Sequence, residues 1–267
     1  MFGTVLAVLG SAAVALAAGN FDTFTATATF KPSAAGSATH PSPFSMSEHW
    51  TAKGSSGGNA APLTKIVAKV YGVQYNGKLF PKCTASQINS AGTSKNWNAV
   101  CPKGSLIGGG PVQASLTGPA GGSGTPCDPW LDIYNGGKNT QTFFFVVGPQ
   151  SPGGKYQCAG GTVKTGTGCA AYSGTLSKSG KYAVETINLP GCASTNAGNI
   201  GAYAALQKLD VTYKKLTKKV KGKVVGYEQS VACAGTKRPY SFTFTAQNFK
   251  GQSPSTQTTT IKHTAKC

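Results

Sequence analysis

The sequence predicts an all-β protein, an antiparallel β-sandwich of Greek-key or jelly-roll type with long Gly/Pro loops and disulfide staples. Several short segments alternate apolar and polar residues with period two, which is typical of half-buried antiparallel strands. Gly, Ser, Thr and Ala are abundant and Leu and Glu are scarce, so few segments favour a helix. The 267-residue chain also contains eight cysteines, an even number that suits pairing.

The N-terminus has the pattern of an export signal. Val5–Leu9 and Ala12–Ala18 form an apolar run that is interrupted only by a Gly-Ser pair. This run is shorter than the roughly 20 residues that a membrane-spanning helix needs, and it ends in a small-x-small cleavage motif. We therefore expect residues 1–17 to be a signal peptide and the remaining chain to have no transmembrane segment. Residues 18–267 are expected to form a single large β-sandwich domain, or two closely packed β subdomains.

Three segments show the strand alternation most clearly. Their apolar positions are Phe24, Ala26, Ala28 and Phe30 in the first, Ile66, Ala68 and Val70 in the second, and Tyr240, Phe242, Phe244 and Ala246 in the third. Phe143–Val147 is apolar at every position, which predicts a central strand covered on both faces. Lys221-Gly222-Lys223 lies between two further strand segments and predicts a hairpin turn. Gly118–Pro126 is rich in Gly, Ser and Pro and is expected to be a loop.

The cysteines indicate an oxidising compartment. No two of them are spaced as C-x-x-C, which argues against a zinc ribbon and a thioredoxin-type redox site. Disulfides persist outside the cytoplasm, so we expect an extracellular or cell-envelope protein. Cys83 and Cys101 bracket a short polar loop and are expected to pair, and a Cys233–Cys267 bond would fix the C-terminus. The pairing of the remaining cysteines stays open: Cys127, Cys158, Cys169 and Cys192.

The chain is strongly basic. Lys and Arg number 25 against seven Asp and Glu, a formal net charge of +18, and Arg238 is the only arginine. Lysines that crowd around the expected hairpin are candidates for binding polyanions: Lys208, Lys214, Lys215, Lys218, Lys219, Lys221 and Lys223. Base recognition favours the planar fork of Arg, so sequence-specific nucleic-acid binding is not expected. Anionic cell-wall polymers or surface glycans are the expected partners; alternatively, the lysines are solvated and keep strand edges unpaired.

A search for catalytic groups finds no convincing constellation. Asp128 and Asp132 lie close together, but their spacing does not match a calcium loop. Glu48 precedes His49, but neighbours on a strand point to opposite faces. Ser56 stands in a G-x-S-x-G match that lacks the strand-to-helix context of a nucleophile elbow. We therefore expect no catalytic residue, no metal ion and no cofactor.

Three functions remain open at this point. The leading expectation is a secreted or cell-envelope protein that is not an enzyme and has a structural or interaction role. The first alternative is a binding module for anionic or glycan cell-wall polymers, which would use the Lys208–Lys223 patch. Three tryptophans are candidates for stacking on glycans, although scattered tryptophans more often anchor a core: Trp50, Trp97 and Trp130. The second alternative is a hydrolase of unrecognised family that depends on His49 or Asp128.

Two segments carry a resemblance to a known group of proteins. Asn76–Cys83 has the sequence N-G-K-L-F-P-K-C, and Cys101–Gly108 has the sequence C-P-K-G-S-L-I-G. They resemble the motif N-G-K-x-F-P-x-C, followed by C-P-x-G-S-x-V-G, of uncharacterised exported β-sandwich proteins common in actinobacteria. Ile107 stands where that group has Val. The resemblance implies export and a β architecture, and it implies no reaction because the group has no established activity.

Overall fold

The computed structural model describes residues 21–32, 36–55, 57–91, 97–118, 120–148, 151–158, 170–193 and 203–267, with only the backbone of residues 97 and 98. In these ranges the chain consists mostly of β-strands that pair antiparallel, which confirms the predicted all-β class. The predicted signal peptide, residues 1–17, lies outside the described residues.

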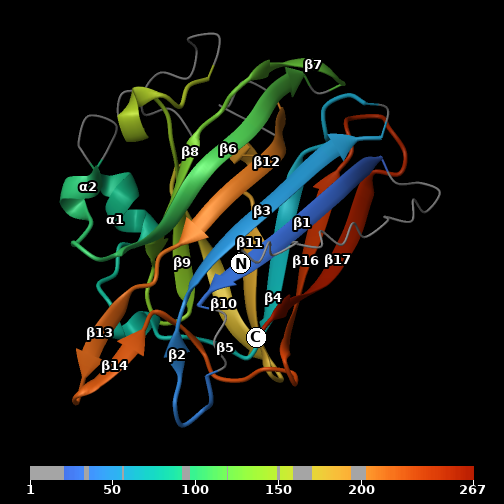
Figure 1. Ribbon diagram of the computed structural model, residues 1–267. Helices are drawn as coiled ribbons and strands as arrows, with labels where there is room; N and C mark the ends of the chain where they lie inside the picture. Colours follow the sequence, from blue (N-terminus) through green and yellow to red (C-terminus); the bar gives the residue numbers. More distant parts are fainter. Residues whose placement is uncertain are drawn as a thin grey trace, which may run out of the picture.

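One large sheet contains most of the strands (Figure 1). They are β1 (Asp22–Lys31), β3 (Ser45–Gly54), β4 (Leu63–Tyr71), β6 (Leu106–Gly118), β7 (Gly121–Pro126), β8 (Trp130–Asn135), β9 (Thr140–Val146), β10 (Tyr172–Ser179), β11 (Tyr182–Asn188), β12 (Tyr203–Tyr213), β16 (Lys237–Gln247) and β17 (Thr256–Lys266). Their hydrogen-bonded order is β1-β3-β12-β6-β8-β9-β10-β11-β4-β16-β17, and β7 pairs with β6. The end strands β1 and β17 contact each other, so one nearly closed sheet provides both layers of the predicted sandwich.

The remaining elements are short. A two-stranded sheet pairs β13 (Thr217–Val220) with β14 (Lys223–Gly226), and a three-stranded sheet joins β2 (Ser42–Pro43), β15 (Glu228–Ser230) and β5 (Val73–Tyr75). The helices are α1 (Ala85–Ser90), α2 (Trp97–Val100) and the 3-10 turns Gly77–Leu79, Pro152–Gly154 and Gly191–Ala193. Lys221 and Gly222 join β13 to β14 with φ angles of 48° and 78°, as a two-residue hairpin turn requires, which confirms the predicted hairpin.

The predicted alternation is confirmed in β1, β4 and β16. Every apolar position predicted in these strands is buried, and the intervening residues are exposed or half-buried. Phe24 of β1 stacks on Phe244 of β16 at 4.9 Å between ring centroids, and Trp50 of β3 meets the same ring edge-on at 5.6 Å. Burying such large side chains together supplies most of the favourable free energy that holds the sheet closed.

The central strand β9 is covered on both faces, as predicted. Phe143 packs in the main core, whereas Phe144 packs in a second cluster outside the sheet with Cys83, Cys101 and Ile88. Ile88 belongs to α1, which begins with a capping box in which Thr84 and Gln87 satisfy each other's backbone N–H groups. The Cys83–Cys101 disulfide therefore fixes a small helical cover over the outer face of β9.

The disulfides include both pairs that the sequence led us to expect. Cys83 bonds to Cys101 and Cys233 bonds to Cys267, with Cα atoms 5.1 Å and 6.1 Å apart. A third disulfide joins Cys127 to Cys158 across an isolated β-bridge. Cys192 is also disulfide-bonded, and Cys169 lies outside the described residues.

Gly118–Pro126 is not the loop that its composition predicted. Strand β6 runs to Gly118 and pairs with β7, so most of this segment forms a β-hairpin. At Gly124 the glycine reflects close packing, because a Cβ there would lie 2.0 Å from the Ser115 Oγ atom. A residue without a side chain is needed there for the hairpin to lie flat.

Side chains close the junction between β1 and β17. The Gln257 Oε1 atom accepts hydrogen bonds from the backbone N–H groups of Phe21 (2.9 Å) and Asp22 (2.8 Å), and its Nε2 group donates to the Asp22 carbonyl (2.8 Å). Farther along, the backbone N–H of Ala28 donates to the Tyr240 hydroxyl at 3.0 Å. Gln257 thus links β1 to β17 through its side chain, and Tyr240 links β1 to β16, the strand that pairs with β17.

We expect Gln257→Ala to destabilise the protein by about 3 kcal/mol, because it leaves the buried N–H group of Asp22 and the part-buried N–H group of Phe21 without acceptors. The measurement is the free energy of unfolding in a urea titration. Gln247→Ala is the matched control, since Gln247 is exposed at the end of β16 and should change stability by less than about 0.5 kcal/mol. Equal losses in the two variants would contradict the closing role of Gln257.

Candidate functional site

The nearly closed sheet separates the charges of the chain. The structure describes all seven acidic residues, and none is exposed: Asp22, Glu48, Glu185 and Glu228 are buried, and Asp128, Asp132 and Asp210 are half-buried. Every lysine that the structure describes is exposed, except the half-buried Lys208. The outer surface is therefore basic with few acidic groups to offset it.

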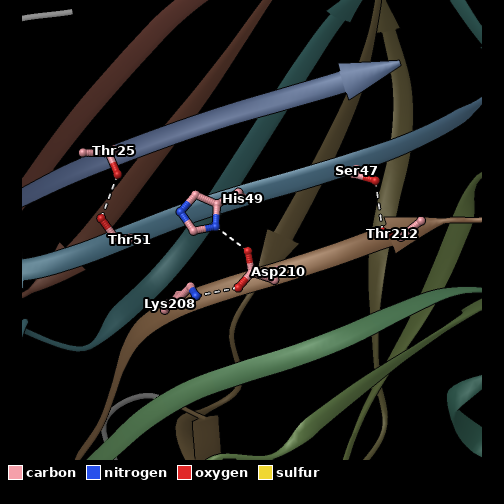
Figure 2. Close-up of polar contacts among 7 residues, drawn as sticks. All are labelled: Thr25, Ser47, His49, Thr51, Lys208, Asp210 and Thr212. Atoms are coloured by element: carbon pink, nitrogen blue, oxygen red, sulfur yellow. Dashed lines mark hydrogen bonds and ion pairs between the residues drawn. The ribbon is translucent and has the colours of Figure 1, made fainter. Parts of the chain in front are cut away.

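A polar cluster lies on the outer face of the sheet, where β3 pairs with β12 (Figure 2). His49 and Asp210 are direct partners in the strand register, and the His49 Nδ1 atom forms a short hydrogen bond with the Asp210 carboxylate. The Lys208 ammonium group contacts the other carboxylate oxygen at 2.8 Å. Partial burial raises the pKa of Asp210, but the hydrogen bonds and charges of Lys208 and His49 outweigh it, and the pKa lies below its ordinary value.

Hydroxyl groups surround this cluster but do not complete a catalytic triad. The Ser47 hydroxyl pairs with Thr212 at 3.0 Å, and Thr25 pairs with Thr51 at 2.7 Å. A His–Asp pair can act as a general base when Nδ1–H donates to the carboxylate and Nε2 accepts a proton. In this arrangement Ser47 is bonded to Thr212 rather than to the imidazole, so the cluster has a base and its orienting acid without a bonded nucleophile.

The cluster borders a cleft of about 1080 Å³ at one end of the sheet. Thr51 and Lys208 belong to its wall, together with Lys53 and the amide side chains of Gln113 and Gln207. The Gln207 amide donates to Asn59 at 2.6 Å, and Asn59 donates to the Gly122 carbonyl at 2.8 Å, so these two side chains brace the β6–β7 hairpin. The cleft thus offers ammonium and amide groups that suit an anionic or hydroxyl-rich ligand.

A second group of titratable residues lies inside the sheet. Glu48 points inward from β3, next to the outward-pointing His49, and Glu185 points inward from β11. Burial raises the pKa of both carboxyls, and for Glu185 the charge of Glu48 raises it further. Burial also raises the pKa of Glu228 and, at the start of β1, raises that of Asp22 to about 7.

The predicted lysine patch is divided between two places. Lys218, Lys219, Lys221 and Lys223 lie on the β13–β14 hairpin, and Lys214 and Lys215 precede it in the chain. Lys208 is separate from the hairpin, because it lies within β12 and pairs with Asp210. The prediction that Lys208 belongs to the hairpin patch is wrong, because β12 continues as a strand to Tyr213.

The tryptophans do not form a shared platform. Trp50 is 2% exposed in the core, so the prediction that it stacks on a glycan is wrong. Trp130 is half-buried, its indole N–H donates to Asp132 at 3.0 Å, and its ring lies 5.1 Å from that of Tyr156. The side chain of Trp97 and the whole of Ser56 lie outside the described residues.

Two further findings concern metals and membranes. Within the described ranges, no group of three or more His, Cys, Asp or Glu residues is arranged to hold a metal ion. The Asp128 carboxylate instead accepts a hydrogen bond from the Ala114 backbone at 3.3 Å. Among the helices that the structure describes, none has the length and apolarity needed to cross a bilayer.

No protein-family model, curated protein or solved structure matches the chain. The resemblance to exported actinobacterial proteins therefore stays a prediction.

We expect the protein to lose stability as the pH rises above the ordinary carboxyl pKa of 4.5, because the buried Glu48 and Glu185 hold their protons more tightly than they do in the unfolded chain. Each unit of raised pKa corresponds to about 1.4 kcal/mol. Chemical denaturation at a series of pH values measures this dependence. The double variant Glu48→Gln/Glu185→Gln should make the profile less steep, with the remaining slope due to Asp22 and Glu228, whose pKa values burial also raises. An equally steep profile in that variant would contradict this assignment.

Proposed function

We propose that this chain is a non-enzymatic extracellular protein that binds anionic cell-envelope polymers through its lysine-covered surface. One observation carries the proposal: all seven carboxyl groups are buried or half-buried, while the described lysines face outward. A surface with so few acidic groups produces a positive potential that attracts polyanions. The disulfides suit an oxidising compartment outside the cytoplasm.

The β13–β14 hairpin is the proposed main contact. It projects at one end of the molecule, beside β2 and away from β7 (Figure 1). Residues 214–226 contain no acidic residue, and the Lys218 ammonium group donates to the Leu79 carbonyl at 3.0 Å, which ties the hairpin to the body of the protein. Lysine ammonium groups are compact point charges on flexible stems, so they suit repeated phosphate or uronate groups without demanding one sequence or geometry.

The cleft beside β3 and β12 is the second contact that the charges support. Lys53 and Lys208 provide ammonium groups there, and Gln113 provides an amide that can bond sugar hydroxyls. Lys208 forms an ion pair with Asp210, which partly neutralises its charge. The cleft therefore serves to orient a bound polymer more than to attract it.

Binding should be electrostatic and therefore sensitive to salt. We test it by titrating the protein with polygalacturonate in a series of salt concentrations, with neutral dextran of equal length as the control. Release of condensed counterions predicts that the logarithm of the binding constant falls linearly with the logarithm of the salt concentration. Binding that is indifferent to salt, or equal binding to dextran, would contradict the proposal.

Replacing the four hairpin lysines with glutamine should weaken polygalacturonate binding about tenfold or more and reduce the salt slope. The substitutions are Lys218→Gln, Lys219→Gln, Lys221→Gln and Lys223→Gln. The matched control removes the same charge from exposed lysines elsewhere: Lys65→Gln, Lys69→Gln, Lys178→Gln and Lys262→Gln. If both sets weaken binding equally, the polymer contacts the whole surface and the hairpin is not the main contact.

The His49–Asp210 pair favours hydrolysis as a second candidate function. A hydrolase using this pair as its base would lose about 100-fold or more of its turnover in His49→Ala. A panel of ester, peptide and glycoside substrates measures that loss, and His40→Ala is the control because His40 is an exposed loop histidine. Activity that survives His49→Ala would exclude this pair as the base.

A further inference from the structure

The interior of the sheet contains a small cavity with two carboxyl groups in its wall. Its volume is about 40 Å³, and Glu48 from β3 and Glu185 from β11 both line it. These strands are far apart in the sheet order, and β11 lies behind β3 in Figure 1. The two carboxyl groups therefore reach the same cavity from different parts of the curved sheet.

Each of these carboxyl groups has a buried oxygen without a hydrogen-bond partner. Glu48 is 8% exposed and Glu185 is 3% exposed, and the Oε1 atom of each is unpartnered among the described residues. The other oxygen of Glu185 accepts a hydrogen bond from the Tyr213 hydroxyl at 3.4 Å. A buried carboxyl oxygen without a donor costs free energy, and an ionised one costs far more unless a cation accompanies it.

Among the described residues that line this cavity, none supplies a cation. The lining contains no lysine, arginine or histidine, and its polar side-chain groups are the two carboxyls, the Tyr172 and Tyr213 hydroxyls and the Trp50 indole N–H. Arg238, the buried arginine, is elsewhere: it lies over the rings of Phe30 and Phe44 and donates to Ser230. A cation that neutralises the two carboxyl groups must therefore come from solution.

The lining also indicates which kind of cation fits. Five aromatic side chains line the cavity with the carboxyl groups: Trp50, Phe143, Phe145, Tyr172 and Phe242. The faces of aromatic rings attract organic and nitrogen cations. Within the described residues no group of three or more His, Cys, Asp or Glu side chains is arranged to hold a metal ion, and the cavity has only two such residues in its wall. The volume holds about three water-sized groups, so a large amine is excluded.

We propose that this cavity is a binding site for a small nitrogen cation, the ammonium ion or methylammonium, held between Glu48 and Glu185. Its N–H groups donate to the two unpartnered carboxyl oxygens, and the aromatic rings cover the rest of the ion. The inference does not depend on polymer binding, because the cavity lies inside the sheet and the lysines lie outside it.

Thermal unfolding in matched chloride salts tests the proposal. The midpoint should rise in ammonium or methylammonium chloride relative to sodium chloride, saturably, by about 3 °C at tenfold excess over the dissociation constant. Tetramethylammonium is too large for the cavity and has no N–H group, so it should give no rise. Equal midpoints in all four salts would overturn the proposal.

Two variants separate this site from general salt effects. Glu48→Gln/Glu185→Gln should abolish the ammonium-specific rise, whereas Glu228→Gln should keep it, because Glu228 is buried but does not line the cavity. A rise that persists in the double variant would overturn the proposal.

The wild-type chain provides a direct readout that needs no variant to fold. Bound ¹⁵N-labelled ammonium should give a distinct NMR signal with contacts to aromatic ring protons, while ammonium in water exchanges quickly. Contacts to aromatic rings support the site. A spectrum with no bound ammonium at saturating concentration means that water fills the cavity and overturns the proposal.

Discussion

Closure of one continuous sheet by side chains is the constraint on which the rest of the structure depends. Gln257 of β17 bonds to β1 at one end of the junction, and the hydroxyl of Tyr240, from the neighbouring strand β16, bonds to β1 farther along. These bonds act at single points, unlike a ladder that repeats along a strand. Without Gln257 the backbone N–H groups of Phe21 and Asp22 would lose their acceptor, and unpaired groups at a sheet edge are templates for aggregation. The neighbouring aromatic stack of Phe24 and Phe244 adds buried area but cannot by itself fix the strand edges.

A closed sheet gives every strand residue an inside or an outside. Glu48 and His49 are neighbours in sequence, yet Glu48 lines the internal cavity and His49 joins the outer cluster with Asp210. A register slip of one residue in β3 would exchange them and would also expose Trp50. Such a slip would bury the imidazole and leave its pairing with Asp210 broken. The charge separation of the molecule is therefore a consequence of strand register, not of any local motif.

The sequence predicted the features that depend on local pattern. The alternation in β1, β4 and β16, the hairpin turn at Lys221-Gly222 and the short-range Cys83–Cys101 pairing depend on nearby residues alone. The His49–Asp210 pair could not be predicted in this way, because the partners are 161 residues apart and meet only through the pairing of β3 with β12. Strand alternation predicts that Asp210 points outward, because the apolar Val211 and Tyr213 point inward. Nothing in the sequence, however, indicates which strand lies beside β12.

The buried acids were missed for a different reason. Glutamate is among the residues least often found in a core, so composition assigns Glu48 and Glu185 to the surface by default. The alternation around Glu48 did place it on the face of Met46 and Trp50, both buried. Apolar neighbours at positions two residues on either side are the signal that would have found it.

Interior and exterior charges are linked through the titration of the buried acids. The formal net charge of +18 counts every carboxyl as ionised. Because burial raises the pKa of Asp22, Glu48, Glu185 and Glu228, the folded protein retains protons on these groups and is more positive than the formal value at mildly acidic pH. Attraction to a polyanion then strengthens as the pH falls toward the ordinary carboxyl range, provided that the polymer stays ionised.

A cation in the cavity affects two of these carboxyl groups. It stabilises the ionised form of Glu48 and Glu185, and its own positive charge offsets the negative charge of the carboxylates. The outer surface therefore stays basic in both cases, whether the buried carboxyl groups are neutralised by protons or by a small cation.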